Sequence, residues 1–207
     1  NFQAADAQIG KARSLIADMG DSALQADIAN DAGLIAEERG DYKAALPYFQ
    51  EVLKLRESQA DAIGVAEASL NLGFAMLHTG NFNEASLHLE YGERTFVANN
   101  DRAGIVRSLQ LLAVVNLARG EFSIARKRLQ RAIVLAEEVN LSEERAVLYL
   151  DTAELERMQN NFAKALDDGN KALLSFKQRD DNRGVTEAQL SIAAINSRAS
   201  LSITETN

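Results

Sequence analysis

The sequence contains no cysteine, no tryptophan and one proline, Pro47. Without cysteine the chain forms no disulfide and has no thiolate nucleophile, and we expect a reducing compartment, the cytoplasm. A single proline among 207 residues is typical of a helical protein, because proline interrupts helices. No apolar run reaches the length of about 18 residues that a membrane span needs, so we predict no membrane partner.

Positive charge is also scarce. The net charge is −8, and 30 acidic residues face 22 lysines and arginines. Non-specific binding to nucleic acid needs a basic face, so we predict that this segment does not bind nucleic acid directly. The chain begins with Asn1 rather than methionine, and we expect it to be a segment of a longer protein.

Residue patterns that carry chemistry are missing as well. The two histidines, His78 and His88, lie in no H-E-x-x-H or similar metal-binding spacing. The chain has no G-x-S-x-G nucleophile turn and no glycine-rich phosphate loop. We therefore predict no enzyme activity, no cofactor and no metal site.

A short pattern recurs at a fixed interval of 40 residues. It consists of a glycine, replaced by asparagine in the fourth copy, an aromatic residue two positions later and an alanine three positions after that. Internal repeats of this length are the signature of helical-repeat folds and decide the architecture. The four copies are Gly40, Tyr42 and Ala45; Gly80, Phe82 and Ala85; Gly120, Phe122 and Ala125; and Asn160, Phe162 and Ala165.

Apolar residues at helical spacing, broken by glycine, asparagine and aspartate, predict about ten helices and no strands. We predict one all-α array over residues 1–199, in which each unit packs on its neighbours, followed by a polar, frayed tail at 200–207. The array contains a lone second helix at 1–18, repeats at about 22–58, 61–98, 102–139 and 143–178, and a lone first helix at 183–199.

These positions resemble the tetratricopeptide repeat, a family whose unit is a hairpin of two antiparallel helices. Leu72 and Gly73 match the family's Leu-Gly pair, Gly80 its turn, Phe82 its aromatic residue and Ala85 its small crossing residue. The resemblance implies a right-handed superhelical solenoid. The unit of 40 residues is longer than the usual 34, and is similar to the long repeats of Pins/LGN-type adaptors and of the sensor regions of MalT-type regulators.

The recurring residues have physical roles that do not depend on the resemblance. Gly40, Gly80 and Gly120 suit a left-handed turn after a helix, and asparagine at position 160 tolerates the same geometry. The recurring alanines predict points where two helices approach closely. The aromatic residues are expected to fill the space under the next hairpin.

In the family, the first helix of each hairpin lines a concave groove, and the resemblance implies a peptide-binding groove here. An alternative interpretation is that the apolar residues Leu70, Phe74, Leu77 and Val114 only pack between adjacent first helices. Helical spacing places the following residues in the groove: Asn30, Leu70, Asn71, Phe74, His78, Arg107, Gln110, Val114, Leu150, Glu154 and Arg157.

Two functions are consistent with these observations. The first is a non-catalytic scaffold that binds a protein or peptide in the groove. The second is the sensory or regulatory segment of a larger signalling protein or transcription regulator, which binds a small ligand or a partner domain. The terminal helices also predict a head-to-tail or dimeric contact between copies, because Ile192, Ala193 and Ile195 keep one side of the last helix apolar.

Overall fold

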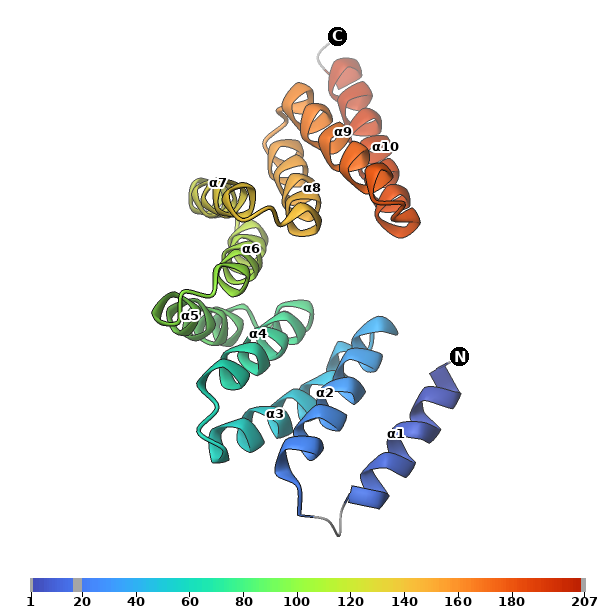
Figure 1. Cartoon of the computed structure of the whole chain (residues 1–207). Helices are drawn as coiled ribbons and strands as arrows, with labels where there is room; N and C mark the ends of the chain where they lie inside the picture. Colours follow the sequence, from blue (N-terminus) through green and yellow to red (C-terminus); the bar gives the residue numbers. More distant parts are fainter. Residues whose placement is uncertain (1, 17–19, 206–207) are drawn as a thin grey trace. The chain divides into compact units, whose positions relative to one another are not determined.

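Ten α-helices follow one another in the part of the chain that the computed structural model describes, residues 2–16 and 20–205 (Figure 1). No strand occurs within these ranges. The eight helices between the first and the last are each 17 residues long, as a regular repeat requires. The helices are α1 (Phe2–Ile16), α2 (Ser22–Glu38), α3 (Tyr42–Ser58), α4 (Ala62–His78), α5 (Phe82–Ala98), α6 (Arg102–Ala118), α7 (Phe122–Glu138), α8 (Ser142–Met158), α9 (Phe162–Gln178) and α10 (Asn182–Glu205).

A residue with left-handed backbone geometry lies between each pair of helices. The turns predicted at Gly40, Gly80 and Gly120 have φ angles of 74°, 82° and 74°. Asn160, which replaces glycine in the fourth copy, has a φ of 59° and keeps the turn. Ala60 is the one alanine with this geometry among the described residues, at a φ of 55°.

Aspartates begin several of the helices. The Asp21 carboxylate accepts hydrogen bonds from the backbone N–H groups of Ala23 and Leu24, and the Asp61 carboxylate accepts one from Gly64. Such caps satisfy backbone donors that have no partner inside the helix. The local sequence thus fixes where one helix ends and the next begins.

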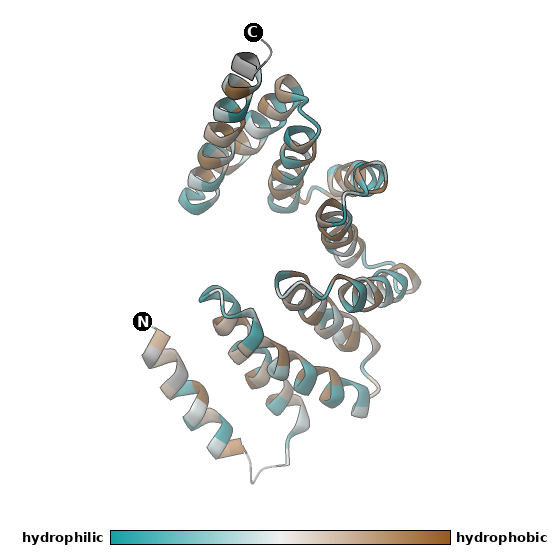
Figure 2. Ribbon diagram, turned by 180° about the vertical axis from the view of Figure 1, so that it is seen from behind, coloured by the Kyte–Doolittle hydropathy of each residue, from teal (hydrophilic) through white to brown (hydrophobic). Residues whose placement is uncertain are grey.

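The chain divides into two compact units, residues 1–104 and 105–207. In the first unit α2 packs against α3 and α4 against α5, and α3 also packs on α4. In the second unit α8 packs against α9, and α10 packs on both of them. Figure 2 shows α6 as largely apolar, and its buried residues include Val106, Leu112 and Val115. The single array over residues 1–199 stays a prediction.

The recurring alanines lie where helices touch. Ala45, Ala85, Ala125 and Ala165 are each 0% exposed. Near Ala85 the approach is so close that a Cβ atom on Gly73 would lie 2.8 Å from the Leu89 side chain. A larger side chain at these points would force the helices apart. The aromatic residues that recur with the alanines, Tyr42, Phe82, Phe122 and Phe162, are half-buried.

The end of the chain differs from the sequence-based prediction. Helix α10 continues beyond residue 199 to Glu205, so residues 200–205 are helical rather than frayed. No glycine or proline follows Gly184 to stop the helix, and the Ser200 hydroxyl donates a hydrogen bond to the Asn196 carbonyl. Of the three residues predicted to keep one side of α10 apolar, Ile195 is buried with Ala153 and Ala165, whereas Ile192 is half-buried and Ala193 is exposed. The prediction of helix over residues 17 and 18 lies outside the described residues.

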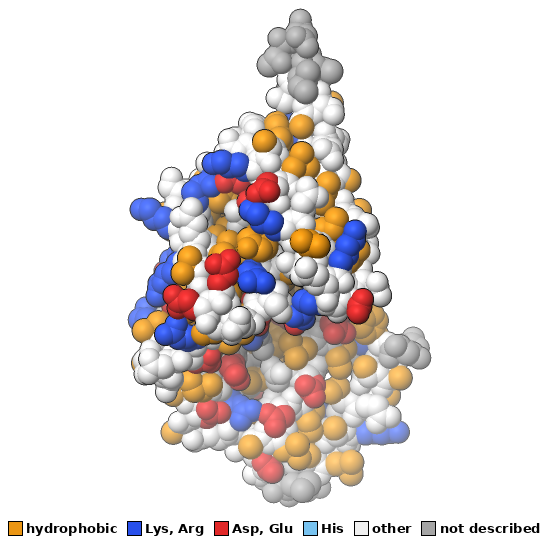
Figure 3. Space-filling view, turned by 45° about the horizontal axis from the view of Figure 1, so that its top comes forward, with side chains coloured by type: hydrophobic (Ala, Val, Ile, Leu, Met, Phe, Trp, Pro, Cys, Tyr) orange, Lys and Arg blue, Asp and Glu red, His pale blue; other side chains and the backbone are white. Residues whose placement is uncertain are grey.

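The surface carries charges of both signs. Figure 3 shows lysine, arginine, aspartate and glutamate side chains interspersed on the visible face. Several pairs join neighbouring helices, for example Arg13 of α1 with Glu51 of α3 at 2.8 Å. In residues 2–16 and 20–205, no helix is long and apolar enough to cross a membrane.

Candidate ligand-binding faces

Helices α2 and α4 are joined by a pair of side-chain amides. The Asn71 Nδ2 donates a hydrogen bond of 3.0 Å to the Asn30 Oδ1, and both residues are half-buried. This bond uses one donor of Asn71 and one lone pair of Asn30. The pair keeps further donors and an acceptor, which is the capacity that an extended peptide backbone requires. These two predicted groove residues are therefore brought together.

Three rings form a cluster to which α4 contributes Phe74 and His78, which follow Asn71 on the same face of the helix at spacings of three and seven residues. The Tyr42 and His78 rings stack with centroids 4.1 Å apart and an interplanar angle of 9°. The Phe74 ring meets both of them edge-on, at centroid distances of 5.9 Å from Tyr42 and 4.5 Å from His78. Partial burial of the imidazole against the other two rings lowers the pKa of His78, so the stacked ring is neutral near pH 7. Tyr42 thus packs on the next hairpin, as predicted.

The predicted groove residue Leu70 lies elsewhere. Its side chain is 0% exposed, and it belongs to the core of α4 and α5, where a Cβ atom added to Gly92 would lie 3.0 Å from it. Leu77 is also buried. Leu70 and Leu77 therefore pack in the core, as the alternative interpretation expects. Phe74 remains half-buried and His78 is exposed.

The second unit has a comparable pair between α6 and α8. The Gln110 Nε2 donates a hydrogen bond of 2.9 Å to the Asp151 Oδ2. Burial raises the pKa of Asp151 to about 7; the Gln110 bond opposes this rise, and the negative charges of Glu187 and Glu154 add to it. This carboxyl is therefore partly protonated near neutral pH.

The remaining predicted groove residues of the second unit differ in exposure. Arg107 is exposed and Val114 is half-buried, whereas Leu150 is buried and packs in the core with Ala146 and Phe176. Glu154 accepts two hydrogen bonds of 2.6 Å from Arg157, in a bidentate pair on the α8 surface. This face is therefore more charged than the α2–α4 face.

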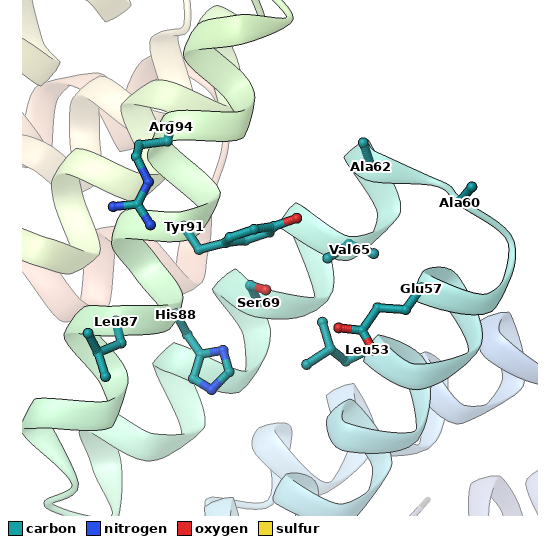
Figure 4. A pocket seen from close by; sticks show the side chains of 10 residues that line it. All are labelled: Leu53, Glu57, Ala60, Ala62, Val65, Ser69, Leu87, His88, Tyr91 and Arg94. Carbon is teal, nitrogen blue, oxygen red and sulfur yellow. The ribbon is translucent and has the colours of Figure 1, made fainter.

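A pocket that the residue spacing did not predict lies between α3 and α5, above α4 (Figure 4). It has a volume of about 650 Å³. Figure 4 shows Ser69 of α4 between Tyr91 and His88 on one side and Leu53 and Glu57 on the other. The walls are mainly apolar and also include Ala60, Ala62, Val65, Leu87 and the Arg94 stem.

The part of the chain that the structure describes contains no group of three histidine, cysteine, aspartate or glutamate residues able to hold a metal ion. His88 lies at the α3–α5 pocket rather than near His78. Burial lowers the pKa of His88, and the Glu84 charge partly opposes this. A neutral imidazole there provides one donor and one acceptor at the pocket.

The fold defines a class: an all-α helical-repeat protein built from antiparallel helix hairpins. Residues 24–91 match the family model described as tetratricopeptide repeat, a segment that spans α2, α3, α4 and the first part of α5. The matched segment includes the Asn30–Asn71 pair, the three rings and most of the α3–α5 pocket. No curated protein matches the sequence.

Solved structures share this fold over most of the chain. Aspartyl phosphate phosphatase F from Bacillus subtilis is 14% identical with a TM-score of 0.78, over 96% of this chain and 53% of its own. BtubC from P. vanneervenii is 14% identical with a TM-score of 0.73, over 96% and 83%. A signal transduction ATPase with numerous domains and a tetratricopeptide repeat sensor, from Pyrococcus horikoshii, is 15% identical with a TM-score of 0.68, over 84% and 27%. The chain thus spans about half of the phosphatase and about a quarter of the ATPase.

Proposed function

We propose that this chain is a non-catalytic scaffold that binds a protein or peptide on the exposed face of α2 and α4. The observation that carries the proposal is the Asn30–Asn71 amide pair beside the rings of Tyr42, Phe74 and His78. The amides offer hydrogen bonds to a peptide backbone, and the rings offer an apolar contact for one of its side chains.

The geometry favours a segment of protein over a small molecule on this face. The amide pair and the rings form a surface rather than a closed pocket, and binding to such a surface requires contacts spread along the ligand. Similarity of fold to other repeat proteins supports this proposal only at the level of the class.

Affinity capture from a lysate of the source cell tests the proposal. The wild-type chain is compared with an Asn71→Ala/His78→Ala double variant, which removes one amide and the exposed ring and whose folding is checked by circular dichroism. A protein captured by the wild type and lost by the variant supports the α2–α4 face. Equal capture by both would place the partner elsewhere and contradict the proposal.

The pocket between α3 and α5 of the same unit provides a matched control. The Ser69→Tyr variant fills the α3–α5 pocket and leaves Asn30, Asn71 and His78 in place. We expect it to capture the same protein as the wild type. Loss of capture in this variant instead of the double variant would assign the partner to the pocket.

A second function is favoured by the pocket between α3 and α5. Its volume of about 650 Å³ lies within the range of roughly 300–1,000 Å³ that small-ligand sites occupy. Together with the fold that the chain shares with an ATPase carrying a tetratricopeptide repeat sensor, this supports a sensory or regulatory segment of a larger signalling protein. Binding of a defined small molecule to the wild-type chain, measured by calorimetry, tests this function.

A further inference from the structure

The pocket between α3 and α5 has a counterpart two repeats later, and the protein fills that counterpart with its own side chain. Eighty residues after Ser69, Glu57 and Tyr91 lie Tyr149, Glu137 and Lys171. There the Tyr149 hydroxyl donates a hydrogen bond of 3.4 Å to the Glu137 Oε1. The Lys171 ammonium lies 5.6 Å from the centre of the Tyr149 ring. A phenol ring therefore occupies this position in the second unit.

In the first unit the same position is open because Ser69 is small. The next copy of this position holds Leu109 and the one after it Tyr149, so Ser69 is much smaller than the residue in either later repeat. Figure 4 shows the space above Ser69 bounded by Tyr91 on the α5 side and by Leu53 and Glu57 on the α3 side. The space suits a ring like that of Tyr149.

The Ser69 hydroxyl supplies a polar group at the floor of the pocket. Ser69 is 2% exposed as a whole residue, and it lines the pocket together with side chains of α3 and α5. A serine hydroxyl can donate one hydrogen bond and accept others. It can therefore bond an acceptor on a ligand in the pocket.

The two sides of the pocket carry exposed side chains of opposite charge, Glu57 on the α3 side and Arg94 on the α5 side. In the described part of the chain, neither of these two side chains forms an ion pair or a hydrogen bond. Glu57 can accept a hydrogen bond from a ligand hydroxyl, as Glu137 does from Tyr149, and Arg94 can pair with an anion.

We propose that this pocket binds a small hydroxyaryl carboxylate. The aromatic ring packs against Tyr91 and Val65 in the position that Tyr149 occupies in the second unit. The ring hydroxyl donates to Glu57. The carboxylate at the other end accepts the Ser69 hydroxyl proton in a hydrogen bond and pairs with Arg94. The inference deepens the second proposed function and rests on it for the biological role of the ligand.

The test is a titration of the ¹⁵N-labelled chain with 4-hydroxyphenylacetate, followed by NMR. We expect chemical-shift changes that centre on Ser69, Tyr91 and Glu57. Phenylacetate lacks the hydroxyl and tyramine lacks the carboxylate, and each should bind about tenfold more weakly, since each loses one charge-assisted contact. Equal binding of all three compounds, or no shift at these residues up to the solubility limit, would overturn the proposal.

Variants test whether the ligand binds in this pocket rather than elsewhere on the molecule. Ser69→Tyr should abolish binding because the new ring fills the site, and Ser69→Ala should weaken it several-fold because only the hydroxyl is lost. Tyr149→Phe, at the filled counterpart, is the matched control and should bind as the wild type does. Undiminished binding by a folded Ser69→Tyr variant would contradict binding at this site. If that variant does not fold, the titration of the wild-type chain still tests the proposal.

Two further titrations complete the test. The first asks whether the pocket takes its ring from a small molecule or from a protein segment, and the second separates this site from the scaffold function. A capped Gly-Tyr-Gly peptide presents the same phenol on a protein chain. If it binds more tightly than 4-hydroxyphenylacetate, the pocket receives a protein segment and the proposal is wrong. The Asn71→Ala/His78→Ala variant should bind 4-hydroxyphenylacetate as the wild type does, so that failure of the scaffold function and failure of this site are separable.

Discussion

The Asn71 side-chain amide donates a hydrogen bond of 3.0 Å to the side-chain carbonyl of Asn30, 41 residues earlier in the chain. Gln110 and Asp151 make the corresponding bond in the second unit, again 41 residues apart and at 2.9 Å. In each unit a polar contact thus joins two successive first helices. The polar residues of these helices hold neighbouring repeats together and at the same time provide the face that we assign to a partner.

Replacing Asn71 by alanine should lower the free energy of unfolding by about 1 kcal/mol, because the cross-helix bond is lost and Asn30 loses its partner. Urea denaturation followed by circular dichroism measures this change. Asn170→Ala, at an exposed position of α9, is the control and should change the stability by less than about 0.5 kcal/mol. An equal effect of both variants would show that the Asn30–Asn71 bond contributes nothing measurable.

The stability of the chain should respond to the protonation of Asp151. Burial raises its pKa from 3.8 to about 7 in the folded state, so between these values the folded state holds a proton that the unfolded state has released. Asp151 therefore lowers the free energy of unfolding progressively as the pH rises through this window. An Asp151→Asn variant has no such group to ionise.

Urea denaturation of both proteins at about pH 5 and about pH 8 checks this sign. The stability of Asp151→Asn relative to the wild type should be greater at the higher pH. A difference that stays constant with pH would mean that Asp151 titrates normally in the folded chain.

Ala60 should be improved by glycine. Its φ of 55° lies in the left-handed region, which costs an L-residue about 1–2 kcal/mol and glycine very little. Glycine also gives the unfolded chain more entropy, which offsets part of this benefit. We therefore expect Ala60→Gly to raise the free energy of unfolding by a net amount of about 0.5–1 kcal/mol, and the melting temperature with it. The same substitution at Ala163, in the first turn of α9, should lower stability. Scanning calorimetry measures both changes: the melting temperature should rise for Ala60→Gly and fall for Ala163→Gly.

A leucine at position 85 should destabilise the first unit. Ala85 is 0% exposed and lies where α4 and α5 cross closely, so Ala85→Leu overpacks the contact by roughly 1–3 kcal/mol. Ala163→Leu, at an exposed position of α9, is the matched control. Unchanged melting of Ala85→Leu would show that the close contact can relax without cost.

Much of the fold was predictable from local signals that repeat. The 40-residue period predicted ten helices, and turns at Gly40, Gly80 and Asn160 followed from residues that tolerate left-handed geometry. The buried alanines followed from the same register. The end of α10 was not predicted, because polar composition after residue 199 does not by itself stop a helix that meets no glycine or proline.

The binding faces were less predictable. Helical spacing placed Leu70 in a groove, but α4 packs on both α3 and α5, and spacing alone does not tell which apolar residues those contacts bury. Nor does it show that Asn71 and Gln110 bond across helices, since that depends on the distance between repeats. The α3–α5 pocket did leave a signal: Ser69 is small where later repeats have Leu109 and Tyr149.

The most direct measurement of the central claim is photo-crosslinking with a benzophenone amino acid at position 78, on the α2–α4 face, and separately at position 87. Leu87 is 67% exposed on α5 of the same unit and serves as the control position. The proposed function predicts that a protein partner from the source cell is crosslinked from position 78 and not from position 87. Crosslinking from position 87 alone, or equally from both, would contradict binding at the α2–α4 face.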